Sequence, residues 1–227
     1  ARYAINNGHR FIYASSAATY GDGKLGFTDD HDQIPSLKPL NMYGFSKQLF
    51  DLWLLNEGLL DKVVGLKYFN VFGPNENHKE RMASMIYHMT NTIQEGKPVR
   101  LFASNDPENY ADGEQVRDFI YVKDAVKVTC DFLENDICGI FNVGTSTPAS
   151  WNQLAKAIYK ALGKTPDIQY VPMPEDLNKQ YQNYTCADLK KYRRALEEKG
   201  LSKMSYYPLE EAVADYVQNY LITGDRW

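Results

Sequence analysis

The chain has 227 residues, 44% of them hydrophobic and 24% charged, which excludes a disordered tail, a collagen and a coiled coil. Its 25 basic and 29 acidic residues give a net charge of −4, so nucleic acid is not an expected partner. No uninterrupted apolar run reaches the roughly 18 residues of a membrane helix, so we expect no membrane association.

Strand and helix patterns alternate from the start of the chain, which opens without Met in a helical pattern, as if cut into partway. The expected elements of the first half are a strand at 11–14, a Gly-, Asp- and Pro-rich loop at 21–40, a long and mostly buried helix at 41–60, a strand at 63–72, a helix at 82–95 and a strand at 99–102. Residues 103–116 are polar and acidic and predict a mobile loop.

The second half continues the alternation. It predicts strands at 119–122, 139–144 and 168–171 and helices at 123–135, 151–162, 186–200 and 208–222. Ser150 and Gln153 form a capping-box pattern, and Pro208 has the place of a first-turn proline. Alternating strands and helices predict an α/β fold with a mostly parallel sheet.

Tyr43 and Lys47 lie four residues apart in the expected helix 41–60, so they share one face of it. A cation beside a phenol favours the phenolate, and a phenolate can take a proton from a hydroxyl as hydride leaves the same carbon. The Lys could also bond a ribose diol. Alone this spacing is a weak signal, because a Lys beside a packed Tyr is equally compatible with it.

A Ser-rich segment upstream strengthens this interpretation. Residues 15–21 (Ser-Ser-Ala-Ala-Thr-Tyr-Gly) follow a strand, and ligands bind at the carboxyl ends of strands in open α/β sheets. Together with the Tyr-x-x-x-Lys helix, this order resembles the short-chain dehydrogenase/reductase superfamily. Its extended, nucleotide-sugar-modifying branch is indicated by residues 68–74 (Tyr-Phe-Asn-Val-Phe-Gly-Pro), 117–122 (Arg-Asp-Phe-Ile-Tyr-Val) and 141–144 (Phe-Asn-Val-Gly).

Three features resemble the ADP-L-glycero-D-manno-heptose 6-epimerase family within that branch. Residues 13–21 lack the Thr-Asp-Glu typical of sugar 4,6-dehydratases, residues 75–85 carry a His-Lys followed by Met-Ala-Ser, and residues 181–185 match a Tyr-Gln-x-x-Thr pattern. The resemblance covers the chain to about residue 222. It implies a Rossmann-like, doubly wound parallel sheet with a smaller α/β substrate-binding region.

The resemblance also implies the chemistry. Tightly held NADP would oxidise C6″ of an ADP-heptose to a ketone and return the hydride to the other face, in the synthesis of lipopolysaccharide inner-core precursors. Inversion needs proton handling on two sides of one carbon, so Tyr43 and Lys79 are the implied acid–base pair and Ser16 orients the reacting oxygen. The implied cofactor contacts are Lys47, Val71, His78 and Lys79, and the implied substrate contacts are Ser16, Asn70, His88, Phe102, Arg117 and Tyr181.

Several of these residues have simpler interpretations. Lys79 could be a solvated loop charge, and His88 could be a satisfied helix histidine. Arg117 could form a surface ion pair with Asp118, and Tyr181 could simply pack. A guanidinium fork does suit a diphosphate, which favours a substrate role for Arg117.

The chain also departs from the family pattern. Arg81 replaces a small residue, and residues 105–116 resemble an insertion. The Gly-rich phosphate-binding turn is absent, so we expect residues 1–75 to be the carboxyl part of the NADP-binding domain. Residues 76–227 would be mainly substrate-binding, with about 117–145 returning to the first domain. Alone, the chain would be inactive and would not retain NADP.

Further expectations concern partners and compartment. Three cysteines (Cys130, Cys138, Cys186) form neither a disulfide framework nor a metal-ligand pattern, so a reducing compartment, the cytoplasm, and no metal are expected. The resemblance suggests a homo-oligomer, a pentamer. Two alternatives stay open: a nucleotide-sugar 4-epimerase or reductase of the same branch, which would not need Lys79, and an inactive fragment without cofactor.

Overall fold

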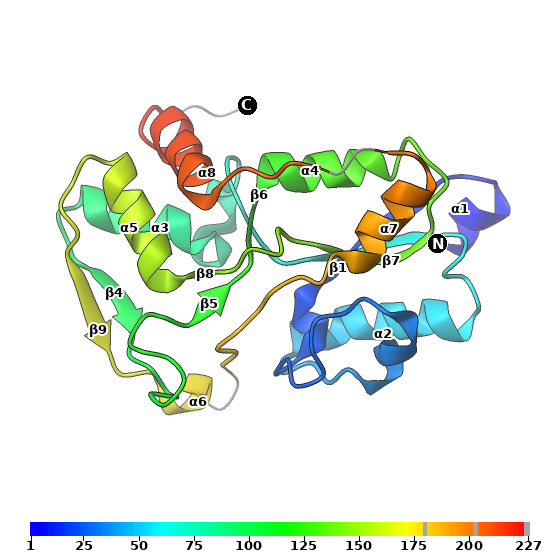
Figure 1. The fold of residues 1–227 in the computed structure, drawn as a ribbon, viewed down its shortest axis with the longest axis horizontal. Helices are drawn as coiled ribbons and strands as arrows, with labels where there is room; N and C mark the ends of the chain where they lie inside the picture. Colours follow the sequence, from blue (N-terminus) through cyan, green and yellow to red (C-terminus); the bar gives the residue numbers. More distant parts are fainter. Residues whose placement is uncertain (179–180, 202–203, 225–227) are drawn as a thin grey trace. The chain divides into compact units, whose positions relative to one another are not determined.

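The computed structural model describes residues 1–178, 181–201 and 204–224. It divides the chain into two compact units, each made of three segments (Figure 1). Unit 1 comprises residues 1–69, 124–146 and 185–205, and unit 2 comprises residues 70–123, 147–184 and 206–227. The polypeptide therefore leaves the first unit and returns to it twice.

The core of unit 1 is a parallel sheet of three strands in the order β1-β2-β7. Its strands are β1 (Ile12–Ser16), β2 (Val64–Tyr68) and β7 (Gly139–Val143). Helix α2 (Met42–Asn56) lies on one face and α4 (Val122–Asp131) on the other, while α7 (Lys190–Glu198) contacts β7 (Figure 1). The predicted α/β class with parallel pairing is confirmed. The unit is completed by α1 (Arg2–Asn6) and two short 3₁₀ helices, η1 (Ala17–Tyr20) and η2 (His31–Ser36).

Helix α2 is shorter and more polar on its inner side than the sequence predicted. It ends at Asn56 rather than Leu60, and Phe45 and Leu49 are 47% and 53% exposed. The residues it buries include Gln48 and Asp51, which hydrogen-bond to other parts of unit 1. The prediction of a mostly buried helix was wrong, because only Gly44, Gln48, Asp51 and Leu54 are buried while apolar side chains such as Phe45 and Leu49 lie on the exposed side.

The single strand predicted over residues 63–72 is two strands. β2 ends at Tyr68, and β3 (Asn70–Phe72) pairs in parallel with β6 (Phe119–Tyr121) instead of with β1 or β7. The backbone N–H of Phe69 bonds to Val143 in unit 1, whereas that of Asn70 bonds to Asp118 in unit 2. The break marks the point where the chain passes between units, which hydropathy does not record.

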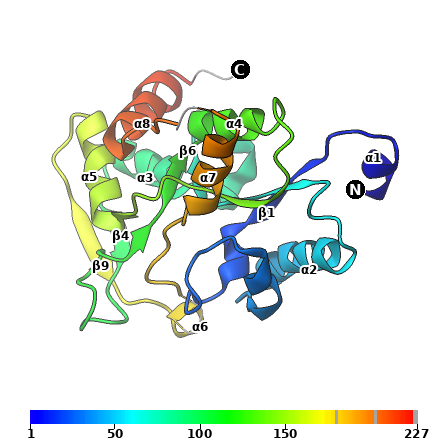
Figure 2. The same cartoon turned by 45° about the vertical axis from the view of Figure 1, so that its right-hand side comes forward.

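The described residues of unit 2 form three strand pairs and three main helices. Besides β3 with β6, the parallel pair β4 (Val99–Phe102) with β9 (Ile168–Val171) and the antiparallel pair β5 (Val116–Arg117) with β8 (Ala149–Ser150) are present. The apolar sides of α3 (Met85–Gln94), α5 (Trp151–Ala161) and α8 (Leu209–Tyr216) pack into one core with these strands. Figure 2 labels β4, β6 and β9 with the helices α3, α5 and α8. The remaining elements are η3 (Asn77–Met82), α6 (Glu175–Asn178) and a π turn at Val217–Leu221.

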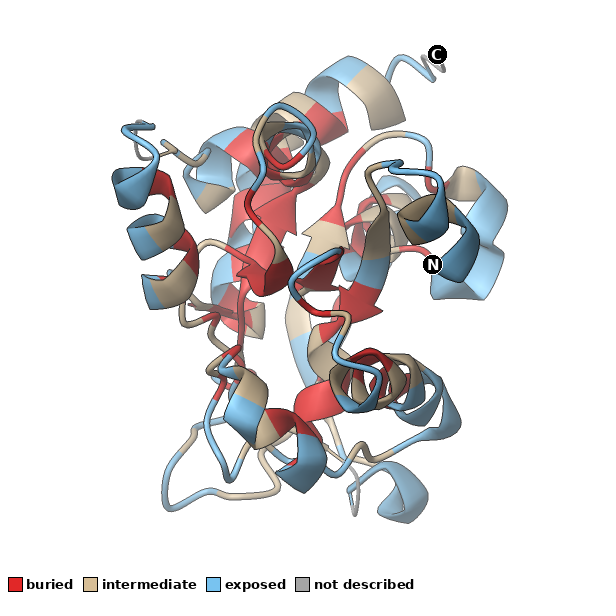
Figure 3. Cartoon of the chain, turned by 90° about the vertical axis from the view of Figure 1, so that its right-hand side faces the viewer, coloured by how far each residue is buried: buried red, intermediate tan, exposed pale blue. Residues whose placement is uncertain are grey.

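Two helices of unit 2 begin at serine caps. The predicted capping box is present, since Ser150 accepts from the Gln153 amide and the Gln153 side chain accepts from the Ser150 amide. Helix α3 begins at Met85, three residues after the predicted start, because Ser84 is its N-cap. Figure 3 shows buried residues on strands and on one side of the longer helices, as amphipathic patterning requires, whereas the short helices α1 and α6 bury no residue.

Candidate functional site

The carboxyl end of β1 in unit 1 carries the Ser-rich segment. Both Ser15 and Ser16 belong to the strand rather than to the loop after it, and both are buried. The Ser16 hydroxyl accepts from the Ala18 amide at 3.1 Å, which turns the chain into η1. The Thr19 hydroxyl donates to the Ser16 carbonyl at 2.8 Å. The turn is therefore fixed by its own side chains.

The first turn of α2 packs tightly against this Ser-rich turn. Asn41 caps the helix by accepting from the Gly44 amide at 2.8 Å. A Cβ added at Gly44 would lie 2.7 Å from the Ala18 carbonyl oxygen, closer than real contacts allow. Glycine between Tyr43 and Phe45 is thus required for the close approach, and the sequence motif gains a structural reason.

Tyr43 and Lys47 lie on the same face of α2. The Lys47 Nζ donates to the Ala14 carbonyl of β1 at 2.8 Å and lies 5.8 Å from the centre of the Tyr43 ring. Tyr43 itself is 58% exposed. An ammonium has three N–H donors, so Lys47 can hold β1 with one and still bond other acceptors. This arrangement can hold an exposed phenol beside a fixed cation at a strand end.

A deeper charged cluster lies under this strand end, and the sequence analysis did not identify it. Lys67 and Asp51 form an ion pair of 2.8 Å with side chains 1% and 0% exposed. The Asp51 carboxylate also accepts from the Tyr13 and Ser15 hydroxyls, each at 2.8 Å. Lys67 lies inside the strand predicted over residues 63–72, and no local pattern pairs it with Asp51.

The His-Lys pair of the sequence lies in unit 2, in η3. His78 and Lys79 are exposed, and the next residue, Glu80, has a left-handed backbone with φ 48°. The segment is anchored by buried Glu76, which accepts from the Ser84 amide at 2.7 Å and the Ser84 hydroxyl at 2.5 Å. The Tyr216 hydroxyl adds a third bond to Glu76 at 2.9 Å. In β3, Asn70 is exposed and Val71 half-buried.

Three of the predicted substrate residues meet in one cluster of unit 2. The Arg117 guanidinium lies 4.9 Å from the centre of the Tyr181 ring and 5.6 Å from that of Trp151. The Trp151 indole N–H donates to the Tyr181 hydroxyl at 2.9 Å, and Phe102 meets Tyr181 edge-on with centroids 6.2 Å apart. We call Phe102, Arg117, Trp151 and Tyr181 the Arg117 cluster.

Arg117 is 8% exposed and Asp118 is fully buried, so a surface ion pair between them is wrong. Burial lowers the pKa of Arg117, and the neighbouring Tyr181 opposes that shift. Trp151 was missed by sequence reasoning, because its place beside Arg117 depends on the pairing of the two-residue strands β5 and β8. Such short strands give no periodic signal.

His88 is half-buried on α3, where its ring meets Tyr87 edge-on at 5.5 Å between centroids. It lines a cavity separate from the Arg117 cluster, together with Met85, Met89, Thr92, Lys97, Pro98, Val99 and Arg100. Both basic and apolar groups therefore surround His88.

Comparison with known proteins shows to which family the chain belongs. The model of the NAD dependent epimerase/dehydratase family matches residues 1–144. The curated ADP-L-glycero-D-manno-heptose-6-epimerase of Nitratidesulfovibrio vulgaris is 49% identical over 222 residues, which covers 97% of this chain and 67% of that protein. The chain belongs to the NAD dependent epimerase/dehydratase family.

Solved structures of epimerases have a fold similar to that of this chain. The Helicobacter pylori ADP-L-glycero-D-manno-heptose-6-epimerase has a TM-score of 0.76 at 29% identity, covering 96% of this chain and 62% of that one. The Thermotoga maritima UDP-glucose 4-epimerase has a TM-score of 0.74 at 26% identity, covering 99% and 67%. The Rossmann-like fold and the resemblance to ADP-heptose 6-epimerases are confirmed, and the chain spans about two thirds of these relatives' length.

The expected insertion of this epimerase/dehydratase chain is fastened by polar contacts. The Asn152 side chain donates to the Asp112 carbonyl at 2.9 Å and to the Glu114 carboxylate at 2.6 Å, and it accepts from the Tyr170 hydroxyl at 3.0 Å. Gly113 packs so closely on Asn152 that an added Cβ would lie 2.5 Å from it. The segment thus has a buried polar anchor that composition does not show. Its mobility without nucleotide sugar stays a prediction.

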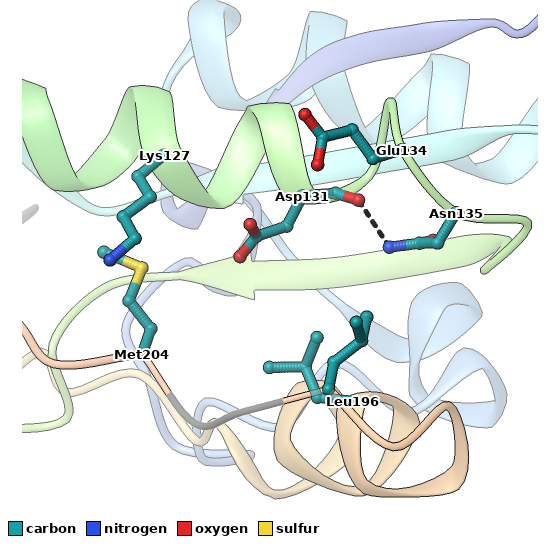
Figure 4. Close-up of a pocket in the computed structure, with 7 residues that line it drawn as sticks. Lys127, Asp131, Glu134, Asn135, Leu196 and Met204 are labelled. Carbon is teal, nitrogen blue, oxygen red and sulfur yellow. Dashed lines mark hydrogen bonds between the residues drawn. The ribbon is translucent and has the colours of Figure 1, made fainter.

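One further cavity of unit 1 contains none of the predicted site residues (Figure 4). It is lined by Lys127, Asp131, Glu134, Asn135, Leu196, Leu201 and Met204. Over residues 1–178, 181–201 and 204–224, no group of three or more His, Cys, Asp or Glu side chains is arranged to hold a metal ion. Within the same ranges, every helix is too short or too polar to span a bilayer.

Proposed function

We propose that the protein is an ADP-L-glycero-D-manno-heptose 6-epimerase that works with NADP in the synthesis of lipopolysaccharide inner-core precursors. The 49% identity to a curated protein of that name supports this activity. The observation that carries it is the strand end of unit 1, where Lys47 bonds to Ala14 at 2.8 Å beside the exposed Tyr43 phenol. An acid–base phenol beside a fixed cation is what reversible oxidation of a sugar hydroxyl requires.

The residues present suit the nicotinamide-ribose side of a dinucleotide, while the Gly-rich turn that would hold its pyrophosphate is not among them. Lys47 uses one N–H on Ala14, so its other donors suit the diol of a ribose. Half-buried Val71 offers an apolar contact, and exposed His78 and Lys79 offer polar ones. When bound, the cofactor would accept hydride from the sugar carbon and later return it. We propose NADP rather than NAD from the family resemblance.

The chain's own residues would manage the protons. Tyr43 takes the proton of the C6″ hydroxyl as hydride leaves that carbon, which gives a ketone, and Ser16 donates a hydrogen bond to the same oxygen. For the inverted orientation, Lys79 gives a proton to the oxygen as hydride returns. The cycle closes when Tyr43 releases its proton to solvent and Lys79 takes one up from solvent. Arg117, stacked on Tyr181 and Trp151, would bind the substrate diphosphate. Asn70, His88 and Phe102 are the other proposed substrate contacts.

The remaining features of the proposal concern organisation. Of the proposed cofactor contacts, Lys47 lies in unit 1 and Val71, His78 and Lys79 lie in unit 2, and unit 2 also carries every proposed substrate contact except Ser16. We propose a homo-oligomer, a pentamer, in the cytoplasm. The resemblance to the epimerase family supports the oligomer, and the absence of a disulfide pattern among Cys130, Cys138 and Cys186 supports the compartment.

Direct assay tests the activity. The full-length protein containing these residues is incubated with ADP-D-glycero-D-manno-heptose, and formation of the L-glycero epimer is followed by chromatography and NMR. UDP-glucose in place of ADP-heptose tests the runner-up, a 4-epimerase. Conversion of ADP-heptose without conversion of UDP-glucose supports the proposal. Conversion of UDP-glucose alone would replace it with the 4-epimerase function. Mass spectrometry of the nucleotide released on denaturation identifies NADP or NAD.

A further inference from the structure

Three residues of α2 share one face and meet β1 in order. Tyr43, Lys47 and Asp51 are spaced by four positions, which places them along one side of the helix. Lys47 holds the Ala14 carbonyl at 2.8 Å, and Asp51 accepts from the hydroxyls of Tyr13 and Ser15, each at 2.8 Å. Three consecutive residues of β1 are thus bonded to this face, which restricts both sliding and rotation of the helix.

Lys67 extends these bonds to the Ser-rich turn. Its Nζ lies 2.8 Å from the Asp51 carboxylate and 2.6 Å from the Thr19 hydroxyl, and 5.2 Å from the centre of the Tyr20 ring. The Thr19 hydroxyl in turn donates to the Ser16 carbonyl at 2.8 Å. An unbroken chain of hydrogen bonds therefore runs from the helix that carries Tyr43, through Asp51, Lys67 and Thr19, to Ser16.

Stability alone does not explain a charged pair at this depth. Apolar residues of similar size often stabilise a buried site as well as an ion pair does, because charges lose hydration there. Burial lowers the pKa of Lys67, while the neighbouring Asp51 opposes that shift. Contacts between apolar side chains are not directional, so packed methyl groups tolerate small shifts. Hydrogen bonds require particular angles and therefore do not tolerate such shifts.

We propose that the buried Lys67–Asp51 pair is a positioning element that sets the Tyr43 face of α2 against Ser16. Neither residue touches the reacting atoms, and the role depends on Tyr43 being the acid–base group proposed above. A misplacement of about 1 Å can lower a rate about 100-fold, so positioning at this point has a large effect.

The proposal is tested by replacing both members of the Lys67–Asp51 pair with uncharged residues in the full-length protein. Removing one partner would leave a buried charge unpaired, so Lys67→Met and Asp51→Asn are combined, and thermal unfolding checks that the variant folds. We expect kcat for ADP-heptose to fall at least about 10-fold with KM changed less than about 2-fold, because the reacting groups are misaligned rather than removed. Wild-type kcat in the folded double variant would overturn the proposal.

A partly exposed pair of the same chemistry in unit 2, with side chains 36% and 23% exposed, controls for loss of any ion pair. Asp215 accepts from Lys123 and from the Tyr121 hydroxyl, each at 2.6 Å, as Asp51 accepts from Lys67 and the Tyr13 hydroxyl. Lys123→Met with Asp215→Asn should leave kcat within about 2-fold. An equal loss of kcat in both double variants would overturn a specific role for the buried pair.

Combining the double variant with Tyr43→Phe distinguishes an effect on the position of Tyr43 from a general loss of activity. If the pair acts through Tyr43, adding Lys67→Met and Asp51→Asn to Tyr43→Phe should lower kcat little further, whereas independent effects would multiply. Multiplied effects would overturn the proposal. Full activity of Tyr43→Phe alone would instead overturn the proposed function, so the two failures are distinguishable.

A milder variant keeps the test decisive if the charge-free pair fails to fold. Ser15→Ala removes one of the hydroxyl donors to Asp51 and leaves the ion pair in place. We expect kcat to fall about 3-fold at unchanged KM, with the loss absent in the Tyr43→Phe background. Wild-type kcat in folded Ser15→Ala would then overturn the proposal.

Discussion

The strand end of unit 1 and the Arg117 cluster of unit 2 hold buried cations in different ways. Lys67 is held mainly by hydrogen bonds to Asp51 and Thr19, whereas Arg117 lies over the rings of Trp151 and Tyr181 and donates one hydrogen bond to the Val116 carbonyl at 2.9 Å. Hydrogen bonds fix direction, while stacking uses the faces of a guanidinium and leaves its edge to bond acceptors. The first arrangement suits alignment of reacting groups, and the second suits recognition of a diphosphate.

The largest expected effect tests the unit 1 side of this comparison. Tyr43→Phe should lower turnover of ADP-heptose at least about 100-fold, because it removes the proposed acid–base group. Steady-state kinetics measure kcat and KM. Tyr3→Phe, a matched change at an exposed Tyr of the same unit, should leave kcat unchanged. Near-normal kcat for Tyr43→Phe would remove this residue from the mechanism.

A second variant tests whether one base suffices. Lys79→Met should stop inversion, with a loss of about 100-fold, and leave bound nucleotide nearly stoichiometric, because a single base serves only one face of the carbon. Product epimer ratio and nucleotide content are the two measurements. Lys156→Met, at an exposed Lys of α5, is the control. Normal epimerisation by Lys79→Met would make Lys79 a solvated loop charge and favour the 4-epimerase alternative.

The distinction between direction and stacking can be tested at Arg117 itself. Arg117→Lys keeps the charge but loses the planar guanidinium that lies on Trp151 and Tyr181. We expect KM for the nucleotide sugar to rise about 10-fold with a smaller change in kcat, the reverse of the pattern expected for the Lys67–Asp51 pair. Arg194→Lys, at an exposed position of α7, is the control. A loss confined to kcat would break the comparison.

The sequence predicted most of the elements and the shared face of Tyr43 and Lys47, because both depend on neighbours in the chain. Tyr43 and Lys47 share a face by helix period alone, and Ser150 with Gln153 caps α5 by spacing alone. The parallel sheet followed from alternation of strand and helix.

Features that depend on contacts between distant segments were not predicted. Lys67 finds Asp51 only because β2 and α2 pack together, and Trp151 meets Arg117 only because β5 pairs with β8. Nor does hydropathy separate β2 from β3, since both belong to one mainly apolar stretch and the structure distinguishes them by the strands they pair with. Buried polar pairs and two-residue strands carry no period, which is why these parts of the candidate site appeared only in three dimensions.

The smallest expected effect concerns the outer edge of β7 in unit 1, where two hydrogen-bond acceptors, Asp29 and His31, are titratable side chains. Asp29 accepts from the Asn142 amide at 2.7 Å, and the His31 Nε2 accepts from the Ile140 amide at 3.0 Å. Burial raises the pKa of Asp29 from 3.8 to about 6. Burial, reinforced by the Lys191 charge, lowers the pKa of His31 from 6.5 to about 4.

These two shifts should act on stability with opposite signs. Between about pH 4 and 6 the folded chain keeps a proton on Asp29 that the unfolded chain releases, so this contribution to stability falls as pH rises. Between about pH 4 and 6.5 the unfolded chain binds a proton on His31 that the folded chain excludes, so this contribution rises with pH.

Relative to wild type, Asp29→Asn should therefore make stability rise more steeply from pH 4 to 6, and His31→Gln less steeply. Urea unfolding at pH 4, 5, 6 and 7 measures both slopes, with Phe102→Leu in the Arg117 cluster as a control that should keep the wild-type slope. Equal slopes for the Asp29 and His31 variants would contradict the assignment, because only opposite shifts in one pH window separate them.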